Sequence, residues 1–494
     1  MADLIMEEKR DSEGLSRVPT EVLSAFRQEM GFSLLIKGAA GSGKTTLVLE
    51  LLSSFEKPVY ISSRVAPSSL YGHFPWLKGK LQPENIIDAT QTFLPWYADE
   101  AALRTHIKQT FKFSTLPEFF KALYERIEEL KNPTIAIDSW EAVVVPLQSN
   151  EAERIHLETL LTEIVRQLNV RLIIVSERVE RTFLDYVVDG VVTLEDSVLD
   201  DRVLRILSIN KTRSVARNNK RYVFTLHDNH FQHVPPFRPL TPRTTGTWVP
   251  TSDVDDFFST GHADLDALYG KGLRPGTFNL LEVDASVPER AYSPIFLGLI
   301  CNFLAKGRGI IVKTMEGINS ELLNKKRLFL FLETELINKY LRVFMEQVST
   351  RREIRPYVVL TSREKFMKDF VEMYDDLSSR TRFQPVFAGV VYDNLDFSSD
   401  YVRCVEAFYQ HLKFIKNSNV VELGVFTSSG DASARGNQQT TSLINDVAAL
   451  ADTHLKVTSV DGSVLLFGVK PYSEIYAIVY DSDDSPKISL LPIV

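Results

Sequence analysis

The chain has 494 residues, of which 44% are apolar and 24% charged; this composition is typical of soluble globular proteins, and the length allows about two to three domains. Its formal net charge of −8 argues against a surface coated in DNA-binding charge, although it leaves room for a local basic patch. No window approaches the ~18 uninterrupted apolar residues of a membrane span, and the first ten residues lack an apolar core of signal-peptide length, so neither membrane insertion nor a signal peptide is expected.

The first predicted elements are a buried strand over 32–36, a glycine-rich loop, and a helix over 45–54. The loop reads Gly38-Ala39-Ala40-Gly41-Ser42-Gly43-Lys44-Thr45 and matches the phosphate-binding loop pattern at every defined position. Its glycines let backbone N–H groups curl around a triphosphate, Lys44 reaches the outer phosphates, and the Thr45 hydroxyl is placed to hold Mg²⁺. Together with Thr46 at the helix N-terminus, these residues form the predicted binding site for ATP and Mg²⁺.

Strands and helices alternate through the rest of the first half. Apolar runs predict strands over 58–62, 134–138 and 171–176, and helical spacing predicts helices over 116–130 and 151–168. Such alternation favours a mostly parallel sheet covered by helices on both faces. Four β-rich pieces close this half, over 190–194, 203–209, 221–226 and 230–234.

A proline-rich stretch separates two segments that repeat one plan. Five prolines between 235 and 250 disfavour regular structure, so the predicted domains are residues 1–234 and 253–494, with a linker over 235–252. Agreement in element order, spacing and terminal residues favours duplication over two unrelated α/β domains with generic patterning. The strands predicted in the second half lie over 278–282, 309–313, 387–393, 420–427 and 463–470.

The duplication does not extend to the phosphate-binding loop. Alignment of the first strands of the two halves puts Asp284-Ala-Ser-Val-Pro-Glu-Arg-Ala291 opposite the loop. No glycine remains there, Pro288 stiffens the turn, and Glu289 adds negative charge. Arg290 falls in the lysine position, but a cation cannot replace a cradle of N–H groups. We therefore expect the second half to lack a phosphate-binding loop and not to bind nucleotide in the usual way.

With these residues placed, the chain resembles the RecA/KaiC branch of P-loop ATPases. The resemblance is clearest over 259–268 and 270–276, and Ile137-Asp138-Ser139 resembles the second metal-binding motif of that branch. Within the branch, the first half is similar to archaeal GvpD-type proteins, named for gas-vesicle regulation, in the loop and over 19–22, 62–71 and 74–76. The resemblance implies two RecA/KaiC-like three-layer α/β domains with mostly parallel sheets. It also implies a regulatory ATPase that forms homo-oligomers and contacts a protein partner, for example a transcriptional regulator.

One carboxylate is predicted at the metal and another at the attacking water. Asp138 ends an apolar strand, where α/β sheets hold their ligands, and its expected role is to hold the Mg²⁺ shell through water. RecA/KaiC-like ATPases usually supply a glutamate just after the second strand, but here that position reads Ser62-Ser63-Arg64, which predicts slow turnover. Glu177, just beyond the fourth strand, is a possible substitute, the alternative being a solvated carboxylate at a helix start. Ser176 could sense the γ-phosphate from the same strand end.

Two basic residues end the predicted strand that begins at 203. Lys211 and Arg213 fall in the region where KaiC-like subunits send a lysine and an arginine to the γ-phosphate bound by a neighbour. They are interpreted either as a finger pair acting across a subunit interface or as a solvated basic turn. The second half keeps the lysine as Lys470 but has Tyr472 where Arg213 would be.

The region between the second and third strands is rich in aromatic residues. Eight aromatic side chains lie between Leu70 and Phe113, where RecA-like proteins make insertions. They are explained either by a satellite core or by a lobe on which a partner docks in response to nucleotide.

Cysteine use favours a reducing cytoplasm. Cys301 and Cys404 both lie in apolar contexts, so buried free thiols are favoured over a disulfide or a metal site.

Together these patterns favour a cytoplasmic, ATP-binding, slowly hydrolysing switch that controls a protein partner. The alternative is a DNA-repair or recombination ATPase of the RadA-paralogue kind. Basic clusters lie over 217–221, 325–327 and 351–352, but interleaved aromatics are sparse around them, so nucleic-acid binding is not favoured. A protein that binds ATP structurally without releasing it, and a KaiC-like kinase, also remain open.

Overall fold

Each half of the chain builds one large β-sheet from its apolar runs. In this computed structural model the described residues are 16–27, 31–62, 67–88, 126–144, 151–213, 215–239, 246–313, 331–346, 356–361, 365–381, 386–391, 401–428, 437–480 and 487–494. Internal contacts divide the chain into a first unit, Met1–Pro235 with Ile493–Val494, and a second unit, Pro236–Pro492.

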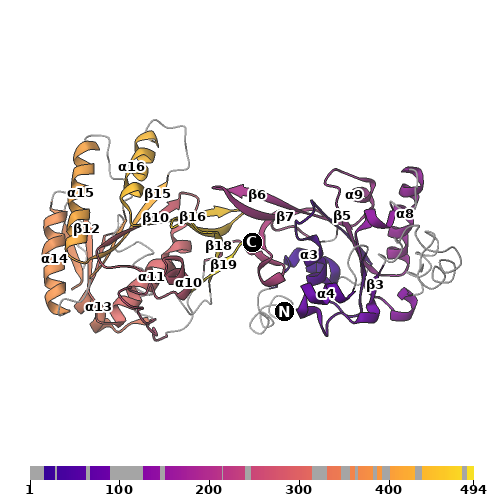
Figure 1. Cartoon of the computed structure of the whole chain (residues 1–494), viewed down its shortest axis with the longest axis horizontal. Coiled ribbons are helices and arrows are strands. Elements are labelled where there is room, and N and C mark those ends of the chain that lie inside the picture. Colours follow the sequence, from indigo (N-terminus) through magenta and orange to yellow (C-terminus); the bar gives the residue numbers. More distant parts are fainter. Residues whose placement is uncertain are drawn as a thin grey trace, which may run out of the picture. The chain divides into compact units, whose positions relative to one another are not determined.

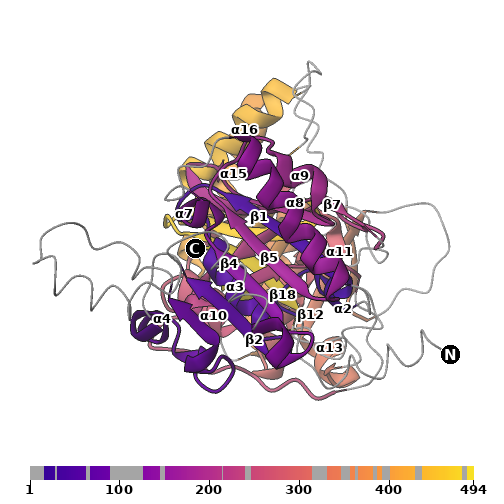
Figure 2. The ribbon, with the colours of Figure 1, turned by 90° about the vertical axis from the view of Figure 1, so that its right-hand side faces the viewer.

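Within the described residues, the first unit contains a nine-stranded sheet in the order β3-β2-β4-β5-β1-β6-β7-β8-β9. The strands from β3 to β6 pair in parallel, and β6 to β9 pair antiparallel. Figure 2 shows β2, β4, β5 and β1 lying side by side. The strands are β1 (Phe32–Gly38), β2 (Pro58–Ser62), β3 (Ile86–Asp88), β4 (Thr134–Asp138), β5 (Arg171–Ser176), β6 (Gly190–Leu199), β7 (Arg202–Thr212), β8 (Arg221–Thr225) and β9 (Gln232–Val234).

Helices cover both faces of this sheet because its central strands are apolar on both sides. In β1, Leu34 and Ile36 pack into the core that contains Leu47 of α3, whereas Leu35 packs into a second core with Leu161 of α8. Figure 1 shows strands of this unit lying between α3 and α8. Each fully buried leucine or isoleucine stabilises the fold by roughly 1.5–3 kcal/mol relative to exposure. The helices are α2 (Thr20–Arg27), α3 (Lys44–Leu52), α4 (Pro67–His73), α7 (Trp140–Val144), α8 (Glu151–Gln167) and α9 (Phe183–Val187), with 3₁₀ turns at Pro75–Leu77, Pro83–Asn85 and His227–Asn229.

The second sheet, again within the described ranges, has ten strands in the order β13-β12-β11-β14-β15-β10-β16-β17-β18-β19. Its strands are β10 (Thr277–Asp284), β11 (Ile310–Lys313), β12 (Leu341–Glu346), β13 (Val358–Thr361), β14 (Phe387–Val391), β15 (Val421–Ser428), β16 (Thr453–Val460), β17 (Ser463–Lys470), β18 (Ile475–Tyr480) and β19 (Ile488–Pro492). Its helices are α10 (Ala263–Leu268), α11 (Glu289–Ala305), α13 (Thr334–Tyr340), α14 (Phe366–Arg380), α15 (Tyr401–Asn417) and α16 (Asn437–Leu450). Residues of α11 and α13 pack on one face, and those of α14, α15 and α16 pack on the other.

The two units share hydrogen bonds that no sequence pattern predicts. In both, the first strand lies between two parallel neighbours, and the strand pair beyond it carries a register shift near its start. The Asp189 carboxylate accepts a hydrogen bond from Ser33 N at 3.1 Å, and the Asp452 carboxylate accepts one from Phe278 N at 3.0 Å. The predicted fold class, two mostly parallel α/β units of the RecA/KaiC kind, is confirmed.

Most predicted elements of the first half appear within one or two residues of their expected bounds. The strand expected over 230–234 begins at Gln232, because a 3₁₀ turn at His227–Asn229 precedes it. Six strands have no counterpart among the predicted elements: β3, β12, β13, β16, β18 and β19. Most of the helix predicted over 116–130 lies outside the described residues. Among the described helices, none has the length and apolar character needed to cross a membrane.

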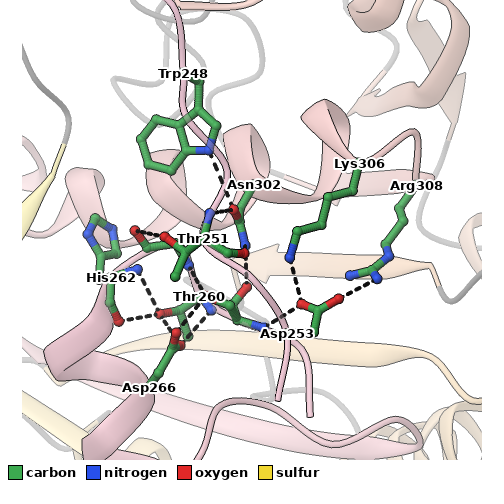
Figure 3. A network of polar contacts seen from close by, with 11 residues as sticks. Trp248, Thr251, Asp253, Thr260, His262, Asp266, Asn302, Lys306 and Arg308 are labelled. Atoms are coloured by element: carbon green, nitrogen blue, oxygen red, sulfur yellow. Dashed lines mark hydrogen bonds and ion pairs between the residues drawn. The ribbon is translucent and has the colours of Figure 1, made fainter. Parts of the chain in front are cut away.

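A network of hydrogen bonds and ion pairs joins residues at the start of the second unit, around the stretch that resembles KaiC (Figure 3). The Asp266 carboxylate accepts hydrogen bonds from the backbone N and the hydroxyl of Thr260, both at 2.6 Å. The Asp253 carboxylate pairs with Lys306 Nζ at 2.7 Å and Arg308 Nη2 at 2.5 Å. Burial raises the pKa of the Asp266 carboxyl. Burial acts the same way on Asp253, but hydrogen bonds from Arg308 and Lys306 outweigh it and lower that pKa.

Candidate functional site

The phosphate-binding loop joins β1 to α3, and its glycines meet specific backbone and packing demands. Gly41 and Gly43 have φ angles of 81° and 92°, in the left-handed region that favours glycine. A Cβ atom at Gly43 would also lie 2.9 Å from a methyl carbon of Leu226. At Gly38 a Cβ would lie 2.6 Å from the backbone oxygen of Leu194. The loop therefore keeps this path only with glycine at these positions.

The loop has the features that an anionic ligand requires. Ala39, Ala40 and Gly41 are exposed, and no side chain caps the N-terminus of α3. Lys44 Nζ lies over the loop and donates hydrogen bonds to Gly38 O at 2.9 Å and Ala39 O at 2.6 Å. Ser42 Oγ is buried and makes no hydrogen bond to any described residue. These residues fit a phosphate group bound by backbone N–H groups, the Lys44 ammonium and the positive end of the helix. Thr46, also assigned to this site, is buried at the start of α3.

Three elements converge on the Asp138 carboxylate at the end of β4. Thr45 Oγ1, from α3, donates to Asp138 Oδ2 at 2.7 Å. Tyr60 Oη, from the neighbouring strand β2, donates to the same oxygen at 2.9 Å. Burial, followed by the negative charge of Asp138, raises the pKa of Tyr60 well above its usual value, so this phenol remains a donor. The structure thus brings together the two predicted metal-binding residues, Thr45 and Asp138.

Sequence reasoning did not identify the role of Tyr60. Tyr60 was predicted only as one residue of the apolar strand over 58–62. The hydrogen bond of its hydroxyl to Asp138 depends on the pairing of β2 with β4. One sequence signal could have revealed this hydrogen bond. Tyr60 lies in a predicted buried strand, next in the sheet to the strand of Asp138, and buried Tyr hydroxyls usually find a partner.

A second carboxylate, Glu141 in the first turn of α7, contacts the end of β5, and no sequence pattern predicted this contact. Ser176 Oγ donates to Glu141 Oε1 at 2.5 Å, and the backbone N of Glu177 donates to Glu141 Oε2 at 3.2 Å. Ser176 and Glu177 were predicted site residues, and the structure shows that both contact Glu141. The spacing of Glu141, three residues after Asp138, was the available sequence signal.

Lys211 and Arg213 contact a different segment of the first unit. Lys211 Nζ donates to the backbone oxygens of Asp185 and Tyr186 at 3.0 and 2.9 Å, and Arg213 pairs with Asp189 at 3.1 Å. Burial, followed by the charge of Arg213, lowers the pKa of Lys211. The two basic residues therefore contact α9 and the residues just after it within the same unit. Their role as a finger pair between subunits stays a prediction.

Several predicted features lie partly or wholly outside the described residues. They are Ser63 and Arg64, the aromatic residues beyond Asp88, and the basic clusters at 325–327 and 351–352. Of the aromatic stretch, Tyr71, Phe74 and Trp76 pack against the first core. Cys301 is a buried free thiol, and burial raises its pKa. Nowhere in the described ranges do three or more His, Cys, Asp or Glu side chains gather as a metal-binding group.

Comparison with known families decides what this loop belongs to. Residues 23–210 match the family model described as the GvpD gas vesicle protein, P-loop domain. The chain carries a GvpD-type P-loop domain. The matched stretch runs from α2 to near the end of β7 and contains the loop, Asp138, Glu141 and Ser176.

Relatives extend the likeness of the GvpD-type domain along the chain. Protein GvpD1 of Halobacterium salinarum is 30% identical over 345 residues, covering 68% of this chain and 63% of the relative. Protein GvpD2 of the same organism is 31% identical over 316 residues, covering 61% and 62%. The circadian clock protein KaiC2 of Synechocystis is 23% identical over 282 residues, covering 55% and 47%. The chain thus aligns with less than two thirds of the length of each GvpD relative. Together these matches identify the first unit as a RecA/KaiC-like P-loop domain.

Proposed function

We propose that this protein binds ATP with Mg²⁺ in its first unit, hydrolyses it slowly, and uses the bound nucleotide to switch its contact with a protein partner. The observation that carries the proposal is the 2.7 Å hydrogen bond between Thr45, in the loop, and Asp138, at the end of β4. One ion can be bound by the Thr45 hydroxyl and linked to Asp138 through water only if these two side chains adjoin.

Each residue of the loop has a role in this proposal. The N–H groups of 38–46 and the Lys44 ammonium bind the phosphates, Thr45 binds Mg²⁺ directly, and Asp138 binds water molecules of the metal shell. Tyr60 holds the Asp138 carboxylate in place. Slow turnover is proposed because Ser62 ends the second strand where relatives of the RecA/KaiC branch usually continue to a glutamate.

The partner is proposed to be a protein, for example a transcriptional regulator, in keeping with the GvpD-type resemblance. Homo-oligomerisation is proposed on the same ground, with Lys211 and Arg213 approaching the γ-phosphate bound by a neighbouring copy. We place this activity in the cytoplasm.

Binding of fluorescent Mg-ATP to the full chain tests the nucleotide site. Lys44→Ala should weaken binding at least ~100-fold, because charge-assisted contacts to phosphate are lost. The matched control is Arg290→Ala, which removes the cation at the aligned position of the second unit and should leave the affinity unchanged. Equal affinity in wild type and Lys44→Ala would refute the assignment.

Phosphate release at varied protein concentration tests the oligomer. Turnover per chain that rises with concentration, and falls in Arg213→Ala, would support a finger supplied by a neighbouring copy. A rate independent of concentration would reject it.

A further inference from the structure

We propose that Glu141 is the carboxylate that activates the attacking water, and that Ser176 positions it. This inference rests on the proposed ATPase function, and it assigns the carboxylate that is missing after the second strand. It differs from the sequence-based hypothesis, in which Glu177 takes that role.

The local structure places Glu141 next to the metal-binding residue. Strand β4 ends at Asp138, and α7 begins at Trp140, so Glu141 lies in the first turn of that helix. Trp140 is fully buried, and its indole Nε1 donates to Glu158 Oε1 of α8 at 3.1 Å. A buried aromatic anchor at the preceding residue keeps α7 in a defined position, as a side chain acting on a reacting atom requires.

The contacts of Glu141 direct its carboxylate across the end of β5. One oxygen accepts from Ser176 Oγ and the other from Glu177 N. Strand β5 lies between β4 and β1, and Ser176 is in register with Lys37, the residue before Gly38 of the loop. The carboxylate is therefore bound to the strand end that separates Asp138 from the phosphate-binding loop. A γ-phosphate held by the loop, and the water that attacks it, would lie along this edge.

The charge of Glu141 is available for this chemistry. Its two hydrogen-bond donors are a hydroxyl and a backbone N–H, and no cation among the described residues pairs with it. Glu158 provides the contrast, because Arg154 Nε pairs with it at 2.8 Å and Trp140 also donates to it. A carboxylate has about four lone-pair sites, so two neutral donors leave capacity for a water molecule.

The proposed step is balanced as follows. Glu141 accepts a proton from water while the water oxygen forms a bond to the γ-phosphorus. The bond between that phosphorus and the bridging oxygen to the β-phosphate breaks, releasing ADP and phosphate. The proton then returns from Glu141 to phosphate or solvent, and no oxidant, reductant or further reactant is needed.

The test uses the full chain with four variants, Glu141→Gln, Ser176→Ala, Glu177→Gln and Glu163→Gln. It measures turnover, trapping of a transition-state analogue and binding of Mg-ATP. Glu141→Gln keeps the shape and one acceptor oxygen but removes the base, so kcat should fall at least ~100-fold while KM changes little. Ser176→Ala should lower kcat about tenfold with KM unchanged, because the carboxylate loses one anchor. The matched control is Glu163→Gln on α8, where an exposed glutamate contacts Gln167 and turnover should not change.

The second measurement does not depend on turnover. Mg-ADP with aluminium fluoride imitates the transferring phosphate with its attacking water, so wild type should trap labelled ADP and Glu141→Gln should release it. Binding of Mg-ATP should stay within about threefold of wild type in all four variants, since none of these residues is assigned to the ground-state complex.

The outcomes separate this inference from the proposed function. Wild-type turnover and trapping in Glu141→Gln would overturn the inference, as would a loss found in Glu177→Gln instead. Mg-ATP binding without turnover in wild type would also overturn it while leaving the nucleotide site in place. Failure of wild type to bind Mg-ATP would instead reject the proposed function.

Discussion

In the first unit, the central strand β1 leads through a glycine-rich loop into a helix that begins with Lys44. In the second unit, the equivalent strand β10 leads through residues 285–288 into a helix that begins with Glu289. The strands around these two connections have the same order and the same parallel pairing. The same strand order therefore accommodates two different connections, a glycine-rich loop in the first unit and residues 285–288 in the second.

The helix starts of the two units differ in charge. The N-terminus of any helix carries partial positive charge and favours an anion. In α3 the first turn contains no acidic residue, whereas in α11 it contains Glu289, so the second unit supplies a negative charge from its own chain. The two connections thus differ both in glycine content and in the charge at the helix start, and both differences favour an anion in the first unit only.

The largest effect is expected from Asp138→Asn, which breaks the site of the first unit alone. Loss of the carboxylate that holds the Mg²⁺ shell should lower turnover about 100-fold, equivalent to about 3 kcal/mol of transition-state stabilisation. Steady-state phosphate release measures this. Asp284→Asn, at the end of β10, the counterpart of β1 in the second unit, is the control for loss of a carboxylate at a strand end. A similar loss there would contradict the difference between the units.

Gly298→Ala should break the second unit while sparing the first. A Cβ at Gly298 of α11 would lie 1.9 Å from Nε2 of the buried His262. Hydrogen bonds from Ile488 N to Nδ1 and between Nε2 and Pro294 O hold the ring, so it has no room to move. Overpacking of this kind should cost about 3 kcal/mol of the free energy of unfolding. Chemical denaturation followed by circular dichroism checks it. In Gly72→Ala, at an uncrowded helix glycine of the first unit, no loss of stability is expected.

Acid should weaken the second unit through His262. Burial lowers the pKa of this imidazole from 6.5 to about 4, so between these values the unfolded chain binds more protons than the folded chain. The free energy of unfolding should therefore fall as pH falls, by about 2 kcal/mol between pH 7 and pH 5. Denaturation curves at several pH values measure this slope. In His262→Gln the contribution should vanish, and an unchanged slope would assign the effect to other groups.

The smallest effect is expected from Tyr60→Phe in the first unit. The change removes one of two hydrogen-bond donors to Asp138 Oδ2 and should weaken Mg²⁺ binding by about 1 kcal/mol. Half-maximal ATP binding should then need a roughly fivefold higher Mg²⁺ concentration. Titration of Mg²⁺ at fixed ATP measures it. Tyr186→Phe, at a side chain that is 65% exposed, is the control for loss of a phenol. Equal Mg²⁺ dependence in the two variants would show that Thr45 alone orients Asp138.

The parts of the site that sequence predicted are those encoded by neighbouring residues. The loop, the strand before it and the helix after it form one continuous stretch, so glycine spacing and apolar runs were sufficient to place them. Asp138 was found for the same reason, because an apolar strand ends at it. The hydrogen bonds of Tyr60 to Asp138 and of Ser176 to Glu141 were not predicted, since each depends on which strands adjoin in the sheet.

The sequence by itself determined the parallel α/β character of both units and the phosphate-binding loop, because both follow from local periodicity and from the backbone freedom of glycine. Only the tertiary structure decided which side chains meet at the strand ends. The pairing of β2, β4, β5 and β1 brings Tyr60, Asp138 and Ser176 to one edge, while Lys211 and Arg213 contact the region of α9. The physical reason is that side-chain hydrogen bonds form between residues distant in sequence, so strand order and register select the partners.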